Sequence, residues 1–514
     1  MSQVLRDARR YEEERASQIL AEDRPAFHLS SRVGWMNDPN GFSYYDGVYH
    51  LFYQYHPYDS HWGPMHWGHA VSPDLIHWDY RPAVMAPDQP YDRDGCFSGS
   101  AITVPGGSFP HMLMYTGIIN VEVNGEMRAV QTQNLAFGDG WDYVKYDGNP
   151  ILTEEDLPEG GSRYDFRDPK IWQEEDGTYR ALIANDFEQE SEIIRRGMTG
   201  EPIEGSDEGG RMLLYRSDDG LHWSFVRVFA ENHGRLGLMW ECPDFFILDG
   251  RAVLIGSAQD MLSSGLEYHN GNGTFCMIGD YDPVSEAFTE KTNQAIDYGI
   301  DFYAPQTILT DDGRRIMIGW MQNWDTCNLH TRSSPWFGQM TLPRELFIRN
   351  GRLCQRPTRE FEALRADPVE TGRCIAENGE IELPGIRGRL IDMTVTIHMD
   401  DPMTDFRRFA VRFAKNDRFY TGVSYRPHER TLKIDRKFSG SRRAIIHQRR
   451  ASVLPVDGKL TLRLILDRYS IEVFVNDGDK VMTATLYTDP SADRISFLAE
   501  GRTVFEVVKA DIRP

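Results

Sequence analysis

A short hairpin unit recurs along the chain, and this repetition restricts the fold more than any other feature of the sequence. Each full copy has a proline at the entrance of an apolar strand and an Asp-Gly pair between that strand and the next. Asp-Gly between aromatic or β-branched runs is a strong signal for a β-hairpin. Four full copies turn at Asp46-Gly47, Asp176-Gly177, Asp249-Gly250 and Asp312-Gly313, and a looser fifth copy starts at Phe97 and turns at Gly106-Gly107.

The copies follow one another at intervals of roughly 60–70 residues, which predicts a radial repeat, although common propeller families repeat every ~40–50 residues. A four-stranded blade with long loops would fill the larger interval. In a β-propeller, equivalent positions of the blades converge on the central channel. Asp38, Asp168 and Glu241 lie at equivalent positions, just before or within the opening of the first strand. We therefore expect carboxylates from three blades to meet in one pocket.

The chain is expected to hold more than one domain, because 514 residues exceed the size of a small domain. Residues 1–24 are rich in arginine and glutamate and are predicted to form a short amphipathic helix that lies on the next domain. The repeats occupy 25–350, and 351–369 resembles a connector with a short helical stretch. Apolar and polar residues alternate in short segments from 370 to 514, which predicts a β-sandwich with a structural or accessory role. The predicted fold class is all-β.

The charge of the chain limits its partners. The formal net charge of 56 − 78 = −22 argues against nucleic acid or an anionic membrane as a partner and favours a neutral or small ligand. No apolar run near the N-terminus resembles a signal peptide, and no later run is long enough to span a bilayer. The six cysteines form no Cys-x-x-Cys pair. We therefore expect reduced thiols in a cytoplasmic protein.

The three acids indicate the chemistry. Paired carboxylates in a polar, aromatic-lined pocket suit glycoside hydrolysis, in which one carboxylate is ionised and the other protonates the leaving oxygen. We expect amide and backbone donors to favour the charged form of Asp38, an apolar flank to favour the protonated form of Glu241, and Arg167 to keep Asp168 ionised. A single acid before proline is more often the cap of a turn. Three such acids in register favour a functional site.

Four motifs, in this order along the chain, resemble those of glycoside hydrolase family 32. They are Trp35-Met-Asn-Asp-Pro-Asn-Gly41, Phe97-Ser98-Gly99-Ser100, Arg167-Asp168-Pro169 and Glu241-Cys242-Pro243. Within the family the chain is most similar to bacterial intracellular β-fructofuranosidases, of the invertase and sucrose-6-phosphate hydrolase type. The likeness covers nearly the whole chain and includes 61–69, 301–306 and 470–476.

The resemblance implies a five-bladed β-propeller followed by a β-sandwich, and an exo-acting β-fructofuranosidase that retains configuration by double displacement. It implies Asp38 as nucleophile, Glu241 as general acid/base and Asp168 as transition-state stabiliser, with the first two carboxyls ~5–5.5 Å apart. It implies neither a metal nor an organic cofactor. The residues expected to contact substrate are Trp35, Met36, Asn37, Gln54, Trp62, Phe97, Ser98 and Arg167.

Sucrose and short fructo-oligosaccharides are the expected substrates. Sucrose 6-phosphate, inulin and levan stay open as alternatives, as does fructosyl transfer to a sugar acceptor. A catalytically silent sugar-binding propeller is the alternative from a different class, although this chain keeps all three acids. The family resemblance implies that relatives often carry a histidine where this chain has Ile300. We expect that difference to change the rim of the pocket and thereby the leaving-group preference.

Three further stretches are interpreted without chemistry of their own. His61, His66 and His69 lack the spacing of a zinc motif, so we expect a loop packed against the pocket. The basic cluster from Arg436 to Arg450 is predicted to be a solvated strand face, with a docking surface for a second subunit of a homo-oligomer as the alternative. The stretch 187–210, rich in Glu, Gly and Arg, is predicted to be a mobile loop.

Overall fold

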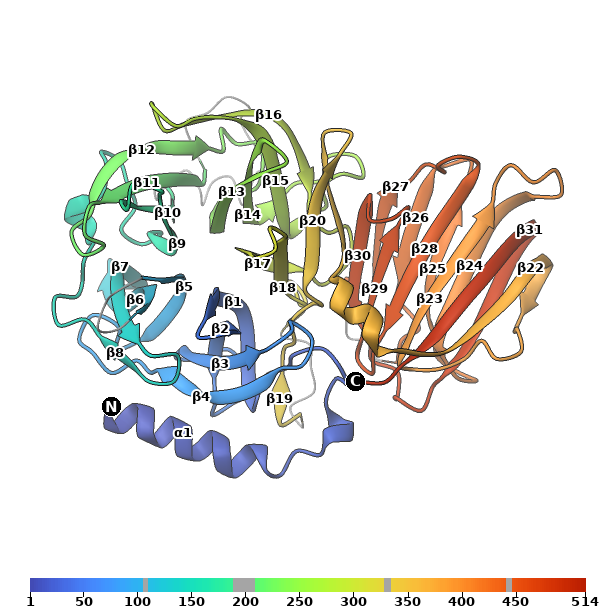
Figure 1. Ribbon diagram of the computed structural model, residues 1–514, viewed down its shortest axis with the longest axis horizontal. Coiled ribbons are helices and arrows are strands. Elements are labelled where there is room, and N and C mark those ends of the chain that lie inside the picture. The colour runs from blue at the N-terminus through green and yellow to red at the C-terminus, as the bar shows by residue number, and fades with distance from the viewer. Residues whose placement is uncertain (105–109, 188–208, 328–333, 441–445) are drawn as a thin grey trace.

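The structure is a computed structural model that describes residues 1–104, 110–187, 209–327, 334–440 and 446–514. Five small sheets stand in a ring, and a larger assembly of strands lies beside the ring (Figure 1). Each small sheet is one blade of a β-propeller, and the first strand of each blade faces the centre. The five-bladed propeller and the all-β fold class predicted from the sequence are confirmed.

Each blade is built almost entirely from consecutive strands. A late two-residue strand, β19 (Trp336–Phe337), pairs in parallel with the first strand of the first blade, so the fifth blade's connection closes the ring. The first blade has β1 (Gly34–Tyr45), β2 (Val48–His56), β3 (His66–Ser72) and β4 (Asp79–Met85), and the second has β5 (Gly95–Thr103), β6 (His111–Val123), β7 (Glu126–Gly138) and β8 (Tyr143–Lys145). The third blade has β9 (Arg167–Gln173), β10 (Tyr179–Asn185), β11 (Arg211–Ser217) and β12 (Ser224–Glu231), and the fourth has β13 (Trp240–Leu248), β14 (Arg251–Met261), β15 (Gly271–Asp282) and β16 (Ala287–Ala295). The fifth blade has β17 (Tyr303–Leu309), β18 (Arg315–Trp320), β20 (Arg344–Arg349) and β21 (Arg352–Pro357).

The hairpin turns follow the backbone chemistry of their residues. Asp46 and Gly47 both have positive φ, as do Asp249 and Gly250. Asp and Gly tolerate this conformation, which two-residue hairpin turns require. The turn expected at Gly106-Gly107 lies outside the described residues.

Two long strands link the two faces of the C-terminal sandwich. The first half of β31 (Arg494–Ile512) pairs with β24 (Asp405–Lys415), and its second half pairs with β23 (Ile391–His398). β22 (Arg365–Ile381) follows β31 along its length on the other edge. The remaining strands are β23 (Ile391–His398), β24 (Asp405–Lys415), β25 (Thr421–Arg426), β26 (Thr431–Asp435), β27 (Gln448–Ser452), β28 (Lys459–Leu466), β29 (Ser470–Val475) and β30 (Lys480–Thr485).

The boundary between the two domains is shorter than the predicted connector 351–369. Arg352 to Pro357 forms β21, the outermost strand of the fifth blade, and β22 of the sandwich already starts at Arg365. The hairpin β20–β21 turns at Asn350-Gly351, where both residues have positive φ. Asn-Gly is a strong hairpin signal, so the sequence contained the evidence for this strand. Only one short helical stretch, η4 (Arg359–Leu364), separates the domains.

The predicted N-terminal helix is α1 (Gln3–Ala16), which lies along β4 at the outside of the first blade (Figure 1). Leu5 and Ala8 are buried, and the Glu12 carboxylate accepts a hydrogen bond of 2.9 Å from the Ala83 backbone N–H. Single 3₁₀ turns occur at η1 (Ala21–Asp23) and η2 (Glu154–Asp156). None of the helices in the described ranges has the length and apolar character that a membrane crossing needs.

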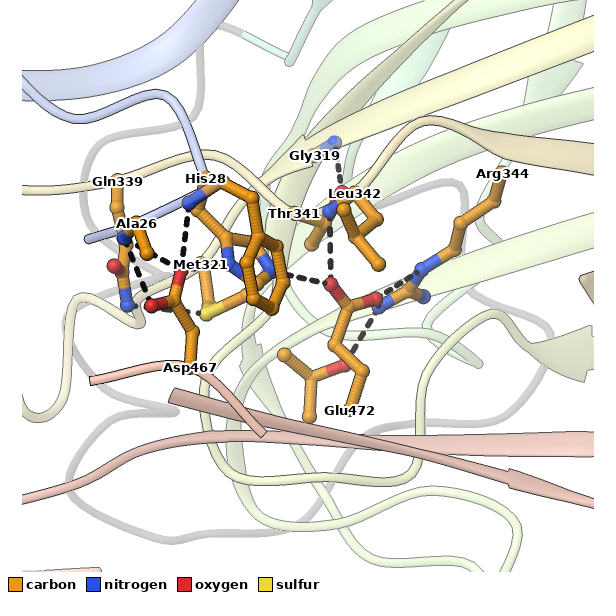
Figure 2. Close-up of polar contacts among 12 residues, drawn as sticks. Ala26, His28, Gly319, Met321, Gln339, Thr341, Leu342, Arg344, Asp467 and Glu472 are labelled. Atoms are coloured by element: carbon orange, nitrogen blue, oxygen red, sulfur yellow. Dashed lines mark hydrogen bonds and ion pairs between the residues drawn. The ribbon is translucent and has the colours of Figure 1, made fainter. Parts of the chain in front are cut away.

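Buried charges join the propeller to the sandwich. Figure 2 shows His28 between two carboxylates, with Nδ1 2.8 Å from Asp467 Oδ2 and Nε2 2.9 Å from Glu472 Oε1. Arg344 of the fifth blade donates to Glu472 Oε2 at 2.8 Å and to Asp297 Oδ2 at 3.0 Å. All five side chains are fully buried. Charged side chains can be buried at this interface because each of them has an oppositely charged partner.

One member of the predicted basic strand face belongs to the same interface. The Arg436 side chain is fully buried and forms an ion pair with Asp301 of the propeller. The prediction of a solvated face is therefore wrong for Arg436, because a chain-distant carboxylate covers it. Residues 441–445 of that cluster lie outside the described residues.

Candidate active site

The first strand of every blade carries a β-bulge at the same place. The pairing register shifts between Met36 and Pro39, between Phe97 and Gly99, between Glu241 and Asp244, and between Tyr303 and Gln306. In the third blade the shift lies opposite Asp168, between Leu182 and Ala184. A bulge leaves a residue unpaired and re-aims its side chain, and bulges are frequent beside active sites. The repeat thus presents side chains from all five blades to the central channel.

The bulges correct one detail of the predicted register. Asp168, Cys242 and Ala304 directly precede proline and share a positive φ of 61°, 49° and 50°. Glu241 stands one position earlier, level with Arg167 and not with Asp168. Because the strand is bulged, both positions reach the pocket, where Arg167 contacts Glu241 and Asp168 contacts Cys242. The three acids therefore come from two neighbouring positions of the repeat.

The structure brings the predicted acids together. The Cys242 thiol sulfur lies 3.6 Å from Asp38 Oδ2 and 3.6 Å from Asp168 Oδ2. Asp168 Oδ2 also accepts a hydrogen bond of 3.0 Å from the Cys242 backbone N–H. Glu241, the residue next to Cys242, is close enough for its charge to act on both aspartates. Carboxylates from the first, third and fourth blades thus share one site.

Asp38 is held at one oxygen and unbound at the other. Ser98 Oγ donates a hydrogen bond of 2.8 Å to Asp38 Oδ2. Asp38 Oδ1 is buried and accepts no hydrogen bond from the described residues. Burial, and next the charge of Glu241, raise the pKa of Asp38 to about 6, and the hydrogen bond from Ser98 opposes the shift only in part. Nearby donors, Asn37 among them, do favour the charged form of Asp38, but removal of water outweighs them, so the expected net effect is wrong.

The Glu241 carboxylate meets polar partners in place of the expected apolar flank. Arg167 Nε donates to Oε1 at 3.1 Å, and the Tyr303 hydroxyl donates to Oε2 at 2.7 Å. The apolar neighbours along the chain, such as Trp240, point into the core. Local sequence misled the prediction here, because alternate side chains of a strand face opposite sides.

Asp168 departs from its prediction for the same reason as Asp38. Burial raises the pKa of Asp168, the positive charge of Arg167 lowers it, and the charges of Glu241 and Asp38 raise it further. The Arg167 guanidinium makes its hydrogen bonds to Glu241 and to Asp165, the latter at 2.9 Å. The net direction is upward, so adjacency to arginine in the sequence did not keep this acid strongly ionised.

The aromatic and amide side chains predicted to line the pocket differ in how exposed they are. Trp62 is 47% exposed, and its ring meets the Phe97 ring edge-on with centroids 6.0 Å apart. Asn37 is buried and accepts a hydrogen bond of 2.7 Å from the Trp35 indole N–H. The buried Gln54 amide donates 3.0 Å to the Cys96 carbonyl and so supports the strand that carries Phe97.

Two predicted contact residues face the core. Met36 is completely buried in the apolar cluster that contains Leu51 and Ile318, so the prediction of a substrate contact is wrong for Met36. Trp35 is also completely buried and packs with Cys242 and Tyr303 beneath the acids. It acts on the pocket through Asn37.

Ile300, which was expected to change the rim of the pocket, also lies away from the rim. It is 1% exposed and belongs to the apolar cluster shared by the propeller and the sandwich. The expected effect of Ile300 on the pocket rim is therefore not supported. The stretch 187–210 is described only at Phe187, Gly209 and Gly210, so its predicted mobility lies outside the described residues.

Sequence reasoning missed two residues of the site, Tyr303 and Cys242. Tyr303 precedes Ala304-Pro305 just as Glu241 precedes Cys242-Pro243. The copy that turns at Asp312-Gly313 therefore carried the signal, although it has Tyr303 where the fourth blade has Glu241. Cys242 was read only as part of a motif, and its thiol lies between the two aspartates.

Comparisons with known proteins agree with this arrangement. The model of the glycosyl hydrolases family 32 N-terminal domain matches residues 28–195 and 202–357, and that of the family 32 C-terminal domain matches 360–514. Raffinose invertase of Escherichia coli is 36% identical over 487 residues, which cover 92% of this chain and 92% of that protein. Sucrose-6-phosphate hydrolase of Escherichia coli is 36% identical over 490 residues, with 92% and 91% covered.

Solved structures give the same result. The GH32 beta-fructofuranosidase BmSUC1 of Bombyx mori has a TM-score of 0.81 at 33% identity, over 99% of this chain and 98% of that chain. A mutant of that enzyme in complex with sucrose has the same TM-score at 32% identity, over the same shares of both chains. Both family models together span nearly all of the sequence, and the propeller, the sandwich and the acid-bearing bulges accompany them. The chain belongs to glycoside hydrolase family 32.

Proposed function

We propose that the protein is an exo-acting, retaining β-fructofuranosidase that hydrolyses sucrose and short fructo-oligosaccharides. The observation that carries the proposal is the meeting of Asp38, Asp168 and Glu241, from three blades, around the Cys242 thiol. A silent sugar-binding propeller would not need three carboxylates in one site with two of them buried, an arrangement that is unfavourable unless they act on a ligand. The relatives named as invertase and beta-fructofuranosidase support the same activity.

In the proposed first step, Asp38 attacks the anomeric carbon of fructose while Glu241 donates a proton to the departing oxygen. Asp38 Oδ1 suits the attack because it accepts no hydrogen bond from the described residues, while Ser98 holds the other oxygen. Arg167 and Tyr303 hold the Glu241 carboxylate in place. Asp168 would accept hydrogen bonds from fructose hydroxyls and oppose the positive charge that develops on the ring.

In the second step, Glu241 removes a proton from water, and that water releases fructose from Asp38. A sugar hydroxyl in place of water would give fructosyl transfer. Transfer products at high sucrose concentration would measure the balance between the two acceptors.

The observations identify the reaction more closely than they identify the leaving group of the substrate. Relatives include proteins named raffinose invertase, sucrose-6-phosphate hydrolase and levanase. We place sucrose first, because the acidic chain, with its net charge of −22, opposes an anionic substrate. The ratio of kcat/KM for sucrose, sucrose 6-phosphate and inulin tests this order. A strong preference for the phosphate ester contradicts our ranking and leaves the reaction itself unchanged.

Substitutions test the catalytic assignment. Asp38→Ala is expected to abolish hydrolysis of sucrose, and Glu241→Ala to lower kcat by roughly 10²–10⁴-fold, the usual contribution of general acid–base catalysis. Asp176→Ala, at an exposed hairpin turn of the third blade, is the matched control and should keep wild-type activity. Substantial activity in folded Asp38→Ala protein would show that the nucleophile was misassigned.

A further inference from the structure

The loop that leads into the fifth blade, which includes Tyr298 to Asp301, is bound to the edge of the sandwich. The backbone N–H groups of Tyr298 and Ile300 donate to carbonyls of β30 at 2.8 and 2.7 Å. A side chain on Gly299 would meet the Thr483 backbone nitrogen at 2.0 Å, so only glycine permits this approach. The loop therefore behaves as an added strand on an exposed sheet edge.

A buried ion pair locks the end of this loop. Asp301 is completely buried and pairs with the Arg436 guanidinium of the sandwich. Asp301 Oδ2 also accepts hydrogen bonds from the Thr485 backbone N–H at 2.7 Å and the Thr485 hydroxyl at 2.9 Å. Thr326 of the propeller donates to Oδ1 at 3.1 Å. Most donors to Asp301 thus come from the other domain.

Two residues after Asp301 the chain reaches the catalytic acid. Tyr303 is 1% exposed, packs among Trp35 and Trp320, and donates its hydroxyl to Glu241 Oε2. The next residue, Ala304, is fixed by a hydrogen bond of 2.9 Å from its N–H to Ser257. Between the anchored Asp301 and the anchored Ala304, Tyr303 has little freedom to move.

We infer that Tyr303 is a positioning residue for Glu241, and that the sandwich keeps it in place through the Arg436–Asp301 pair. The C-terminal domain would thereby serve proton transfer to the leaving group and not stability alone. The inference rests on the proposed function, because it assigns Tyr303 to the same proton donor. The charged and titratable groups that face Glu241 in the pocket are Arg167, Asp38, Asp168, Cys242 and Tyr303.

The test compares two fructosides that differ in their need for a proton. Glucose leaves sucrose only with protonation, whereas nitrophenolate leaves p-nitrophenyl β-D-fructofuranoside without it. Because kcat/KM reports the steps up to cleavage of the glycosidic bond, it isolates the acid role of Glu241. For Tyr303→Phe we expect kcat/KM on sucrose to fall about 10- to 100-fold, since small misplacements carry losses of this size. On the nitrophenyl compound we expect less than about 3-fold loss.

The domain contact is tested separately. Arg436→Gln with Asp301→Asn removes both buried charges together, so no unpaired charge opposes folding. We expect the same selective loss on sucrose, smaller than for Tyr303→Phe, and partial retention of activity in Arg436→Lys, which keeps the charge. His28→Gln is the matched control, because His28 lies buried at the same interface but contacts neither Tyr303 nor Glu241. It should lower Tm and leave the ratio of the two kcat/KM values unchanged.

Equal losses on both substrates would overturn the inference, because the pocket would then be distorted as a whole. Unchanged kinetics in a folded double variant, shown by its circular dichroism and thermal unfolding, would overturn the link to the sandwich. A wild-type enzyme that cleaves neither fructoside contradicts the proposed function itself. That outcome is seen before any variant is made.

Discussion

Single residues in the pocket carry charge in a place that disfavours it. Asp38 is buried, and the Cys242 thiol contacts both Asp38 and Asp168. The negative charge of Glu241 also acts on Asp38. Its pKa is raised to about 6, first by burial and then by Glu241. A group arranged in this way destabilises the folded protein whenever it is ionised. Function and stability therefore compete at Asp38.

The raised pKa of Asp38 sets the direction in which the stability of the folded protein changes with pH. The folded-state pKa lies above that of an unfolded aspartate, so the destabilisation is absent below about pH 4 and is complete above about pH 6. Asp38→Asn should thus be inactive yet more stable than wild type at pH 7.5, by at most about 3 kcal/mol for a shift of two units. Chemical denaturation at pH 4 and pH 7.5 checks this.

Glu370→Gln, on an exposed part of β22, is the control and should show no such dependence on pH. An Asp38→Asn protein that is less stable than wild type at pH 7.5 would mean that the carboxylate is better solvated than the structure indicates.

At the scale of elements, the β-bulge in the first strand of each blade directs side chains of the repeated units into one pocket. A regular strand would send Arg167 and Asp168 to opposite faces. The bulge directs both toward Glu241 and Cys242. In the second blade the bulge places Ser98 against Asp38, and Gly99 follows it where a Cβ would lie 1.9 Å from the Met114 carbonyl oxygen.

Gly99→Ala is therefore expected to damage the pocket as well as the blade. The added methyl cannot fit without displacing β6, so we expect a loss of about 2–3 kcal/mol in the free energy of unfolding, in the range for overpacking a tight site. Because Ser98 would move with the bulge, kcat on sucrose should fall as well. Gly379→Ala is the control, since its Cβ would meet nothing closer than 3.7 Å. Equal behaviour of the two variants in denaturation and kinetics would contradict this account.

At the scale of the whole molecule, buried charges hold the two domains as one unit. His28 bridges Asp467 and Glu472 while Arg344 binds Glu472 from the fifth blade (Figure 2). Burial opposes the charged form of His28, but its hydrogen bonds and its attraction to the two carboxylates outweigh burial and raise its pKa to about 9. The imidazolium therefore contributes to the association of sandwich and propeller.

This contribution should disappear at high pH. The folded pKa of His28 lies above the unfolded value, so the stabilisation is complete below about pH 6.5 and is lost as pH rises through about 9. At pH 6, His28→Gln should lower the free energy of unfolding by about 3 kcal/mol, because it leaves the buried Asp467 without its cation and Glu472 with Arg344 alone. The difference from wild type should shrink at pH 10, measured by denaturant titration.

His77→Gln removes an exposed histidine that pairs with Asp74 and is the control. Surface pairs contribute ~0–1 kcal/mol, so little change is expected. A His28→Gln deficit that stays constant from pH 6 to pH 10 would show that His28 acts through shape and not through charge.

The sequence by itself determined the repeat, the hairpin turns, the two kinds of domain and which three acids meet in one pocket. These features are local, since a turn depends on the φ that Asp, Asn or Gly tolerates, and a motif is contiguous in the chain. The same local signal at Asn350-Gly351 would have located the end of the propeller.

Only the tertiary structure decided how the acids are charged, which residues face the pocket and how the domains touch. Asp38 is desolvated by other blades, Glu241 is held by Arg167 and Tyr303, and Arg436 is buried by Asp301. Met36 and Ile300 stand near motif residues but pack into cores. Burial and long-range charge depend on groups that the chain brings together only when it folds, and neighbours in the sequence do not reveal them.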